Sequence, residues 1–258
     1  MRIVVLVKDV PDTYDERRLD LETGYADREA GQSVLDEIDE RALELALTTA
    51  ERLPDVEVAV LTMGPQAARP TVRKALATGA DSAVHVVDDA LAGADLTLTA
   101  EVLAAALRHT GFDLVIAGDA STDGGGGAVP AMVAEHLGVP HLTALTTAQI
   151  TAGAVSGTRA VTGGVAHVSA DLPAVVSVTE AFPDARLPKL RGIMAAKKKP
   201  YRTLGLADLG VDPAGGDRAR SVVVSVAERP ARAAGVKIVD EGDAGEQLAE
   251  FLVANRLA

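Results

Sequence analysis

The chain has 258 residues, a formal net charge of −12 and no cysteine. Without cysteine it can form no disulfide, no thiolate nucleophile and no cysteine-ligated zinc or iron–sulfur site. The acidic balance and an aromatic content of only 2% disfavour nucleic-acid binding, which needs cations and stacking rings. No apolar run reaches the roughly 18 residues of a membrane span, and the first residues are too briefly apolar for a signal peptide. We therefore expect a cytoplasmic protein without direct membrane insertion.

Strands and helices alternate through the first half of the chain. Near-continuous apolar runs predict buried strands at 1–7, 56–63, 82–87 and 112–117. Helical spacing predicts helices over 34–53, 65–78 and 96–109, with Ser33 as the cap of the first. A polar excursion is expected at 17–31. This alternation is typical of a doubly wound, mostly parallel α/β sheet.

The pattern changes after Pro140. Short alternating runs at 142–150, 155–161 and 165–169 predict antiparallel strands added at an edge of the sheet, and the run 174–179 is expected to return to its core. From Phe182 we expect irregular chain, then a Pro/Gly linker at 212–217, a last strand at 221–226 and a terminal amphipathic helix at 246–257. The chain is thus divided into an α/β domain over 1–211 and an extended C-terminal arm over 212–258.

The strand at 112–117 leads into a glycine-rich loop. Gly118 is followed by the sequence Asp-Ala-Ser-Thr-Asp, then by Gly124 to Gly127, and a helix is expected to begin near Ala128. Glycines let backbone N–H groups approach a ligand closely, and a helix start favours an anion such as phosphate. The spacing is neither the Rossmann fingerprint nor a Walker A loop. A glycine run can also be a plain linker, so the loop alone leaves both readings open.

Three strand ends suit a ligand. In open parallel sheets, ligands bind beyond the carboxyl ends of the strands, where the strand order reverses. The segments 6–11, 63–65 and 118–129 each follow a predicted strand, and their convergence favours a nucleotide. The five histidines show no metal spacing, and Asp123 is a loop hydrogen-bonding residue more readily than a base. No metal site and no catalytic set are expected.

The segment 186–202 contains seven cations and no acid. Three apolar residues lie among them, Leu190, Ile193 and Met194. Charge runs are usually solvated loops. An apolar anchor ringed by cations, however, suits an acidic partner with a hydrophobic pocket, so a docking surface is the favoured interpretation.

Seven blocks resemble the beta (small) subunit of electron-transfer flavoproteins, the FixA-like group. They are 5–13, 35–42, 63–65, 74–81, 118–130, 172–176 and 192–200. The resemblance extends along nearly the whole chain and implies an adenine-nucleotide alpha-hydrolase-like fold. It implies a heterodimer with an alpha subunit that carries most of the FAD site. Electrons would come from dehydrogenases, such as the acyl-CoA dehydrogenases of fatty acid beta-oxidation, and pass to an electron-transfer flavoprotein–quinone oxidoreductase. The subunit itself would be no enzyme.

The resemblance also implies site residues. A structural AMP would contact Leu6, Asp36, Glu37, Ile38, Asp39, Met63, Gly118, Asp119, Ala120, Ser121, Thr122, Asp123, Gly124, Gly125, Gly126, Gly127, Ala128 and Val129. Thr13 and Ile38 would approach the flavin of the alpha subunit. Leu190 would anchor partner dehydrogenases, together with Ile193, Met194, Lys197, Lys198 and Lys199. The C-terminal arm and its helix would pack on the partner subunit.

The chain departs from the family pattern in three places. Ser33-Val34 stands where many relatives have Asn-Pro, and Ala160 stands where some carry an acid. Gly124–Gly127 replaces Asp-Thr-Gly-Gln, which leaves mainly backbone N–H groups for a phosphate. Some bifurcating relatives bind a second FAD where AMP usually lies, so the nucleotide stays open.

Two other classes remain as alternatives. An ATP-using enzyme of the pyrophosphatase-loop kind would need a Ser-Gly-Gly loop after the first strand, and 8–13 has none. A nucleotide-sensing module like a universal stress protein would have a different glycine spacing.

Overall fold

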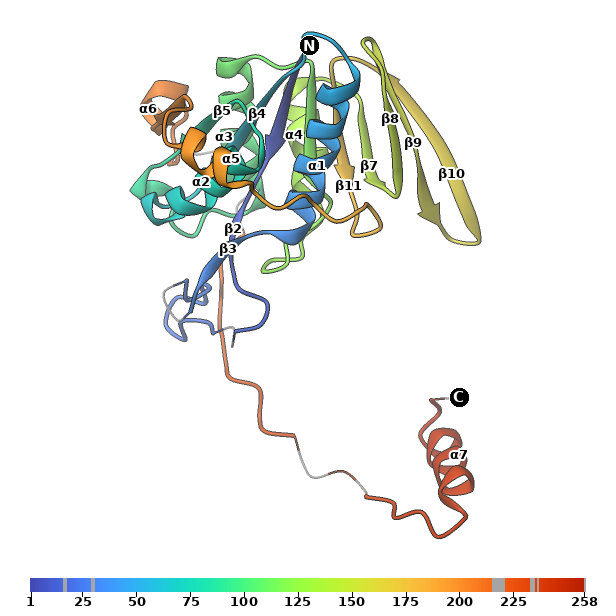
Figure 1. Ribbon diagram of the computed structural model, residues 1–258. Helices are drawn as coiled ribbons and strands as arrows, with labels where there is room; N and C mark the ends of the chain where they lie inside the picture. Colours follow the sequence, from blue (N-terminus) through green and yellow to red (C-terminus); the bar gives the residue numbers. More distant parts are fainter. Residues whose placement is uncertain (16–17, 29–30, 215–220, 233–234, 236, 258) are drawn as a thin grey trace. The chain divides into compact units, whose positions relative to one another are not determined.

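The computed structural model describes residues 1–15, 18–28, 31–214, 221–232, 235 and 237–257. It divides into two compact units, Met1–Val224 and Ser225–Ala258. The first unit is built on a seven-stranded sheet with the order β12-β5-β4-β1-β6-β11-β7 (Figure 1). Its strands are β1 (Arg2–Leu6), β4 (Glu57–Met63), β5 (Ser82–Val86), β6 (Leu114–Gly118), β7 (His141–Leu145), β11 (Ala174–Val178) and β12 (Tyr201–Leu204). All neighbouring strands are parallel, which confirms the predicted fold class.

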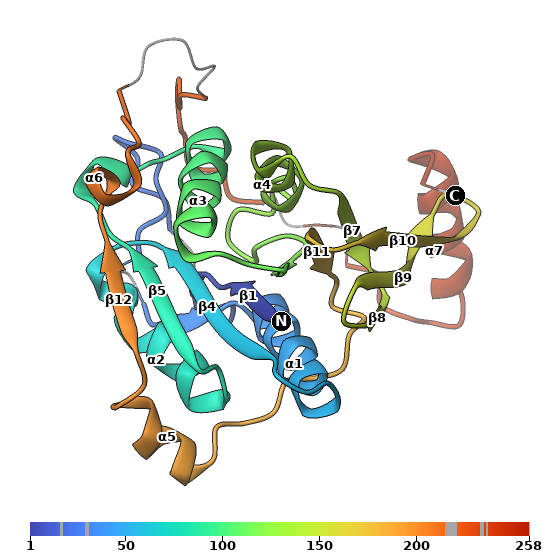
Figure 2. The same ribbon diagram turned by 90° about the horizontal axis from the view of Figure 1, so that it is seen from above.

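Helices cover both faces of this sheet (Figure 2). They are α1 (Glu37–Arg52) and α2 (Arg69–Thr78) on one face, and α3 (Leu96–Thr110) and α4 (Val129–Leu137) on the other. Alternate residues of β1 enter opposite cores, Ile3 and Val5 toward α1 and Val4 and Leu6 toward α3. A strand buried on both faces needs apolar residues at every position, which explains the continuous run seen in the sequence.

A three-stranded antiparallel sheet lies beside β7. It consists of β8 (Thr147–Ile150), β9 (Ala154–Val161) and β10 (Gly164–Asp171). One face packs on the core through apolar residues such as Ile150 and Val155. The expected antiparallel strands at this edge are therefore confirmed. So is the return of 174–179 to the core, since β11 lies between β6 and β7.

Two expectations about element boundaries are wrong in detail. Ser33 does not cap the first helix, because Ser33–Leu35 forms β3, which pairs antiparallel with β2 (Asp9–Pro11). Asp36 is the cap instead, and its side chain accepts a hydrogen bond from the backbone N–H of Ile38. The single strand expected at 142–150 is two strands, β7 and β8, which belong to different sheets.

The later part of the chain is more regular than expected up to residue 209. The segment expected to be irregular contains α5 (Leu190–Ala196) and the edge strand β12, and α6 (Leu206–Leu209) follows. By contrast, the strand expected at 221–226 is not formed among the described residues 221–232. Of the expected linker 212–217 and excursion 17–31, residues 215–217 and 17, 29 and 30 lie outside the described residues. Within 18–28 one isolated bridge joins Leu19 and Ala26.

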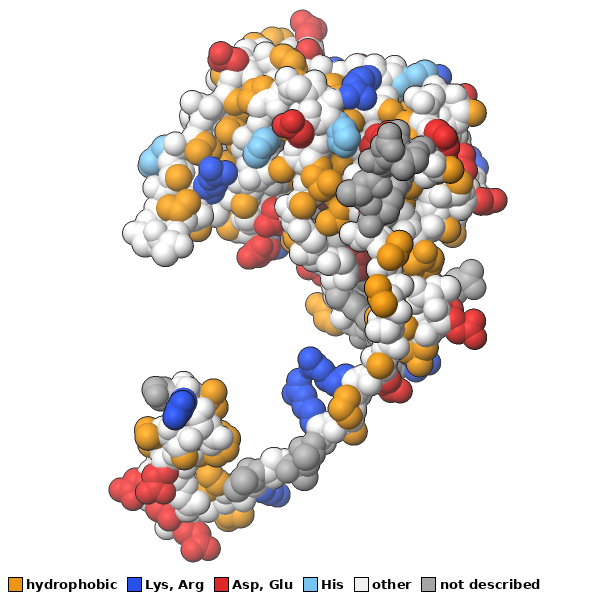
Figure 3. Space-filling model, turned by 180° about the vertical axis from the view of Figure 1, so that it is seen from behind, with side chains coloured by type: hydrophobic (Ala, Val, Ile, Leu, Met, Phe, Trp, Pro, Cys, Tyr) orange, Lys and Arg blue, Asp and Glu red, His pale blue; other side chains and the backbone are white. Residues whose placement is uncertain are grey.

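The second unit contains α7 (Ala244–Ala254), close to the predicted terminal helix. Its apolar side chains Leu248, Phe251 and Val253 are exposed, and hydrophobic groups are visible over its surface in Figure 3. An amphipathic helix whose apolar side is exposed is typical of an interaction surface. None of the described helices is both long and apolar enough to cross a membrane.

Candidate nucleotide site and docking surface

The strand order reverses at β1. The chain runs from β1 outward through β4 and β5, and then returns to place β6 on the other side of β1. Ligand sites of doubly wound sheets lie at this switch point, beyond the carboxyl ends of the two strands. Those ends are Leu6 and Gly118, and the end of β4 at Met63 is the next along the same edge. The fold therefore brings the three predicted strand ends together.

Asp39 joins the two strand ends at the switch point. Its Oδ2 accepts a hydrogen bond of 2.8 Å from the backbone N–H of Lys8, and its Oδ1 accepts one of 3.0 Å from that of Gly118. Burial, reinforced by the charge of Asp36, raises the pKa of Asp39 to about 8. A Cβ atom on Gly118 would lie 2.7 Å from Asp39 Oδ1, so a glycine is needed for α1 to approach β6 this closely.

Asp36 holds the glycine-rich loop against the start of α1. Its Oδ1 caps the helix at the N–H of Ile38 over 3.0 Å. Its Oδ2 accepts hydrogen bonds from both the backbone N–H and the hydroxyl of Thr122, at 2.7 and 2.9 Å. These contacts tie the loop between β6 and α4 to α1 at Thr122, just before the four glycines.

Asp123 forms the charged end of the loop. Its carboxylate pairs with Lys8 Nζ at 2.6 Å and with Arg28 Nη2 at 3.1 Å. Burial alone would raise the pKa of Asp123, but the hydrogen bond and charge of Lys8 outweigh it and lower the pKa to about 2. Lys8 also donates to Ser121 Oγ over 3.1 Å. Asp123 is thus a loop hydrogen-bonding residue, as its position in the sequence indicated.

Sequence reasoning did not include Lys8 and Arg28 among the site residues. Lys8 ends the first apolar strand, so a signal for it existed in its place at a strand end. Arg28 lies within the polar excursion, 95 residues from Asp123, and its local sequence contains no signal for that contact.

The four glycines beyond Asp123 are exposed to solvent. Gly125 and Gly127 have φ angles of +60° and +61°, a left-handed conformation that side chains rarely adopt. α4 begins at Val129, and no side chain caps it at Ala128 within the described part of the chain. Gly124 and Gly125 donate their N–H groups within the loop, to Asp123 Oδ1 over 2.6 Å and to the Ser121 carbonyl over 2.8 Å. The candidate backbone donors for an anion are then those of Gly126, Gly127 and the first turn of α4, at the positive end of the helix dipole.

The remaining predicted contacts lie around this loop. Thr13 Oγ1 donates to Glu37 Oε1 over 3.3 Å, which places Thr13 beside the start of α1, next to Ile38. Asp119 Oδ1 is buried and has no hydrogen-bond partner among the described residues, and burial raises the pKa of this carboxyl. Ala120 is half-buried. No group of side chains suited to a metal ion occurs in the described ranges.

The predicted docking residues lie on α5 and just after it. Leu190, Ile193 and Met194 are 75%, 47% and 66% exposed, and Lys197 and Lys198 are also exposed. Their spacing of three and four residues places the apolar side chains on one side of the helix. Two of the seven cations differ: Arg186 pairs with Glu44 and Glu51, and Lys199 turns inward to backbone carbonyls.

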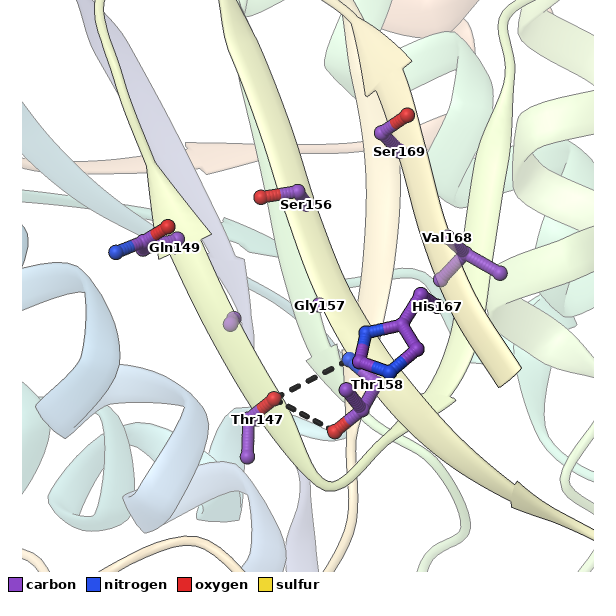
Figure 4. Close-up of a pocket in the computed structure, with 9 residues that line it drawn as sticks. Thr147, Gln149, Ser156, Gly157, Thr158, His167, Val168 and Ser169 are labelled. Carbon is purple, nitrogen blue, oxygen red and sulfur yellow. Dashed lines mark hydrogen bonds between the residues drawn. The ribbon is translucent and has the colours of Figure 1, made fainter. Parts of the chain in front are cut away.

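A concavity lies on the outer face of the β8–β9–β10 sheet (Figure 4). It has a volume of about 540 Å³ and is lined by short polar side chains, including Thr147, Ser156, Thr158 and His167. Thr147 and Thr158 hydrogen-bond across two strands over 2.7 Å. This is the polar face expected of an antiparallel sheet whose other face is buried, and it lies on another sheet from the switch point.

These features define the class: a doubly wound α/β protein with a glycine-rich loop at its switch point and a separate exposed apolar surface with lysines beside it. The electron transfer flavoprotein domain model matches residues 25–209. Electron transfer flavoprotein subunit beta of Mycobacterium tuberculosis (strain ATCC 25618 / H37Rv) is 48% identical over 262 residues, covering 99% of this chain and 98% of the relative. The chain belongs to the family of electron transfer flavoprotein beta subunits.

Relatives of lower sequence identity support the same family assignment. Electron transfer flavoprotein subunit beta of Bacillus subtilis (strain 168) is 34% identical and covers 82% of each chain. A subunit of the caffeyl-CoA reductase–Etf complex of Acetobacterium woodii, CarD, is 35% identical and covers 83% of this chain and 81% of the relative. The protein is therefore an electron carrier that functions with an alpha subunit and in association with flavin. This assignment decides against the two alternative classes considered from the sequence.

Proposed function

We propose that this beta subunit binds AMP at the switch point, helps to hold the FAD of its alpha subunit, and receives electrons from acyl-CoA dehydrogenases and related enzymes. The electrons would pass to an electron-transfer flavoprotein–quinone oxidoreductase and so to the quinone pool. One observation carries the proposal. Asp36 and Asp39 tie the glycine-rich loop and Gly118 to α1. Gly124 and Gly125 donate their N–H groups within this loop, and Gly126 and Gly127 lie exposed just before α4.

The phosphate of AMP would be held mainly by the backbone. The glycine run has no side-chain donors, so the N–H groups of Gly126, Gly127 and the first turn of α4 would supply the hydrogen bonds. Lys8 and Arg28 both pair with Asp123, and Asp36 also contacts the loop, so these side chains together give no net positive charge and the phosphate would depend on the backbone. No bond is broken or formed in this step, because the site binds and orients a nucleotide.

The alpha subunit would be held by two parts of the chain. Thr13 and Ile38 lie beside the start of α1 and would approach the flavin. The arm beyond residue 212 and α7 would pack on the alpha subunit through the exposed apolar residues Leu248, Phe251 and Val253. FAD, when bound, supplies the redox chemistry, and this chain contributes orientation and contact surfaces.

Donor dehydrogenases would dock at α5. Leu190 is the central apolar anchor, and Ile193 and Met194 extend the same face, with exposed lysines on the rim. The relative from Acetobacterium woodii is named for a complex with a reductase of a CoA ester, which supports enzymes of CoA esters as the partner class.

The test is the nucleotide content of the heterodimer. The chain would be co-expressed with its alpha subunit, and the nucleotides released by acid would be identified by mass spectrometry and quantified. We expect FAD and AMP in equal amounts. Two FAD per heterodimer would mean that FAD replaces AMP, and a complex without any adenine nucleotide besides FAD would contradict a nucleotide site at the switch point.

A further inference from the structure

Helix α5 rests on the backbone of α2. A Cβ atom placed on Gly192, in the middle of α5, would lie 2.2 Å from the carbonyl oxygen of Ala77. Real Cβ atoms never approach a backbone oxygen so closely, so any side chain at 192 would push the two helices apart. Gly192 thus allows a direct contact of main chain with main chain, and the neighbouring Ala196 is buried in the same core.

Each of the two helices has its carboxyl end satisfied by a cation associated with the other. Arg73 of α2 donates from Nη1 to the carbonyl of Ala196, the last residue of α5. Lys199, just after α5, donates from Nζ to the carbonyls of Leu76, Gly79 and Ala80 at the end of α2, at 2.9, 3.1 and 2.6 Å. The last carbonyl groups of a helix lack hydrogen-bond partners within the helix. Cations at that end supply such partners and interact favourably with the negative end of the helix dipole.

The chain leaving α5 is fixed as well. The guanidinium groups of Arg73 and Arg69 lie 4.8 and 5.1 Å from the centre of the Tyr201 ring. The Tyr201 hydroxyl lies 2.7 Å from Nδ1 of the fully buried His85, whose Nε2 lies 3.1 Å from the carbonyl oxygen of Gly64. The strand β12 that begins at Tyr201 then pairs with β5.

These contacts matter because α5 cannot be helical by itself. It has seven residues, a glycine in its interior and no side-chain cap at Lys189 within the described residues. Isolated helices below about 12 residues are marginal in water even with good sequences, and an interior glycine costs about 1 kcal/mol more. The helical form of the docking segment therefore depends on α2.

We propose that Gly192, Arg73 and Lys199 are positioning residues that hold α5 as a preformed docking helix, and that Lys199 is not one of the cations that meet the partner. The proposal rests on the proposed docking role of α5. A binding element that is already ordered loses less conformational entropy on association. The docking cations are then the exposed ones, Lys197 and Lys198 among them.

The test distinguishes residues that position α5 from exposed lysines that attract the partner by their charge. The heterodimer variants Gly192→Ala, Lys199→Met and Lys198→Met would be compared in electron transfer from a purified acyl-CoA dehydrogenase and its acyl-CoA substrate, at salt concentrations from 20 to about 500 mM. We expect Lys198→Met to slow transfer at low salt and to approach the wild-type rate at high salt. Gly192→Ala and Lys199→Met should lose at least threefold at every salt concentration, and Lys199→Arg should recover part of that loss.

Two results would overturn the proposal. One is a loss for Lys199→Met that disappears at high salt as it does for Lys198→Met. The other is an unchanged rate for Gly192→Ala. If a variant does not assemble with the alpha subunit, Arg73→Met removes one of the two helix caps and replaces it in the comparison. A normal rate for Leu190→Ala would instead contradict the docking role of α5, which is a failure of the proposed function and not of the positioning alone.

Discussion

Asp39 is a carboxyl group in an unusual setting, since it is buried and accepts two backbone N–H groups. Its pKa is raised to about 8 by burial first and by Asp36 second, whereas its value in the unfolded chain is near 3.8. Between these values the folded state binds more protons than the unfolded state. The contribution of the Asp39 carboxyl group to stability is therefore complete below about pH 4 and is lost as the pH rises through 8.

We predict that Asp39→Asn changes the pH dependence of stability. The wild-type heterodimer should lose stability relative to the variant as the pH rises from 5 to 8, with a slope of up to about 1.4 kcal/mol per pH unit. Thermal unfolding of both proteins at several pH values in this range measures the difference. A difference that stays constant across the range would contradict a raised pKa at this position.

For Asp123 the pKa shift has the opposite direction, so its effect on the pH dependence of stability is reversed. Its pKa is lowered to about 2, so its contribution is present above about pH 4 and is lost as the pH falls through 2. We predict that Asp123→Asn destabilises the heterodimer at pH 7 by about 1 to 2 kcal/mol, a figure reduced because Lys8 and Arg28 are partly exposed.

A matched control for Asp123 is Asp184→Asn. Asp184 also pairs with an arginine, Arg41, but its side chain is 91% exposed, and exposed pairs contribute little. Thermal unfolding at pH 7 should show a clear loss for Asp123→Asn and almost none for Asp184→Asn. Equal effects of the two substitutions would mean that the pairing of Asp123 with Lys8 and Arg28 does not fix the loop.

Site residues were accessible from the sequence to very different degrees. The glycine run was evident, because four consecutive glycines after a buried strand are an obvious feature. The roles of Asp36 and Asp39 came only from the family resemblance, since acidic residues in a first helical turn also suit the helix dipole alone. The contact of Arg28 with Asp123 joins distant segments, and local sequence contains no information on such pairs.

At the scale of the elements, α5 is a helix with one exposed apolar face and one face on α2. We predict that Leu190→Ala leaves the heterodimer folded and weakens dehydrogenase docking by about 2 kcal/mol, roughly thirtyfold in affinity, as expected for a central apolar anchor. Stopped-flow measurement of electron transfer at low heterodimer concentration reports this loss.

Leu187→Ala is the control for the anchor. Leu187 is as apolar and as exposed as Leu190, but it precedes the helix. A loss specific to Leu190→Ala supports a single anchor on α5, and an unchanged rate for both variants would contradict docking at this surface. Weakening of transfer by salt is expected in the wild type, since a cationic rim acts mainly on the rate of encounter.

The type of an element could be predicted where the spacing of apolar residues followed a helix or strand pattern over many residues. The boundaries of the elements could not be predicted in this way. The residue type of Ser33 predicts a helix cap. In the structure Ser33 belongs to β3, which pairs with β2, and α1 begins at Glu37. The break between β7 and β8 depends on which sheet each strand joins. The edge strand β12 and the short helix α5 depend on neighbours that are distant in sequence, so no local pattern reveals them.

For the whole molecule, the alternation of strands and helices was sufficient to predict a doubly wound sheet with three strand ends suited to a ligand, but not the strand order. What it could not supply is the occupant of the site, because a backbone anion site accepts any phosphate of suitable shape. The family assignment makes the chain a subunit of a flavin-associated electron carrier, and AMP at the switch point is the proposal that the next experiment tests.

The most direct test compares AMP with adenosine. Both would be titrated calorimetrically into heterodimer freed of its beta-site nucleotide, with FAD retained. If backbone N–H groups at Gly126, Gly127 and the start of α4 hold the phosphate, AMP should bind at least about 100-fold more tightly than adenosine, or roughly 3 kcal/mol, with adenosine weak or undetectable. Equal affinities for AMP and adenosine would contradict the phosphate-binding role of the loop on which this account depends.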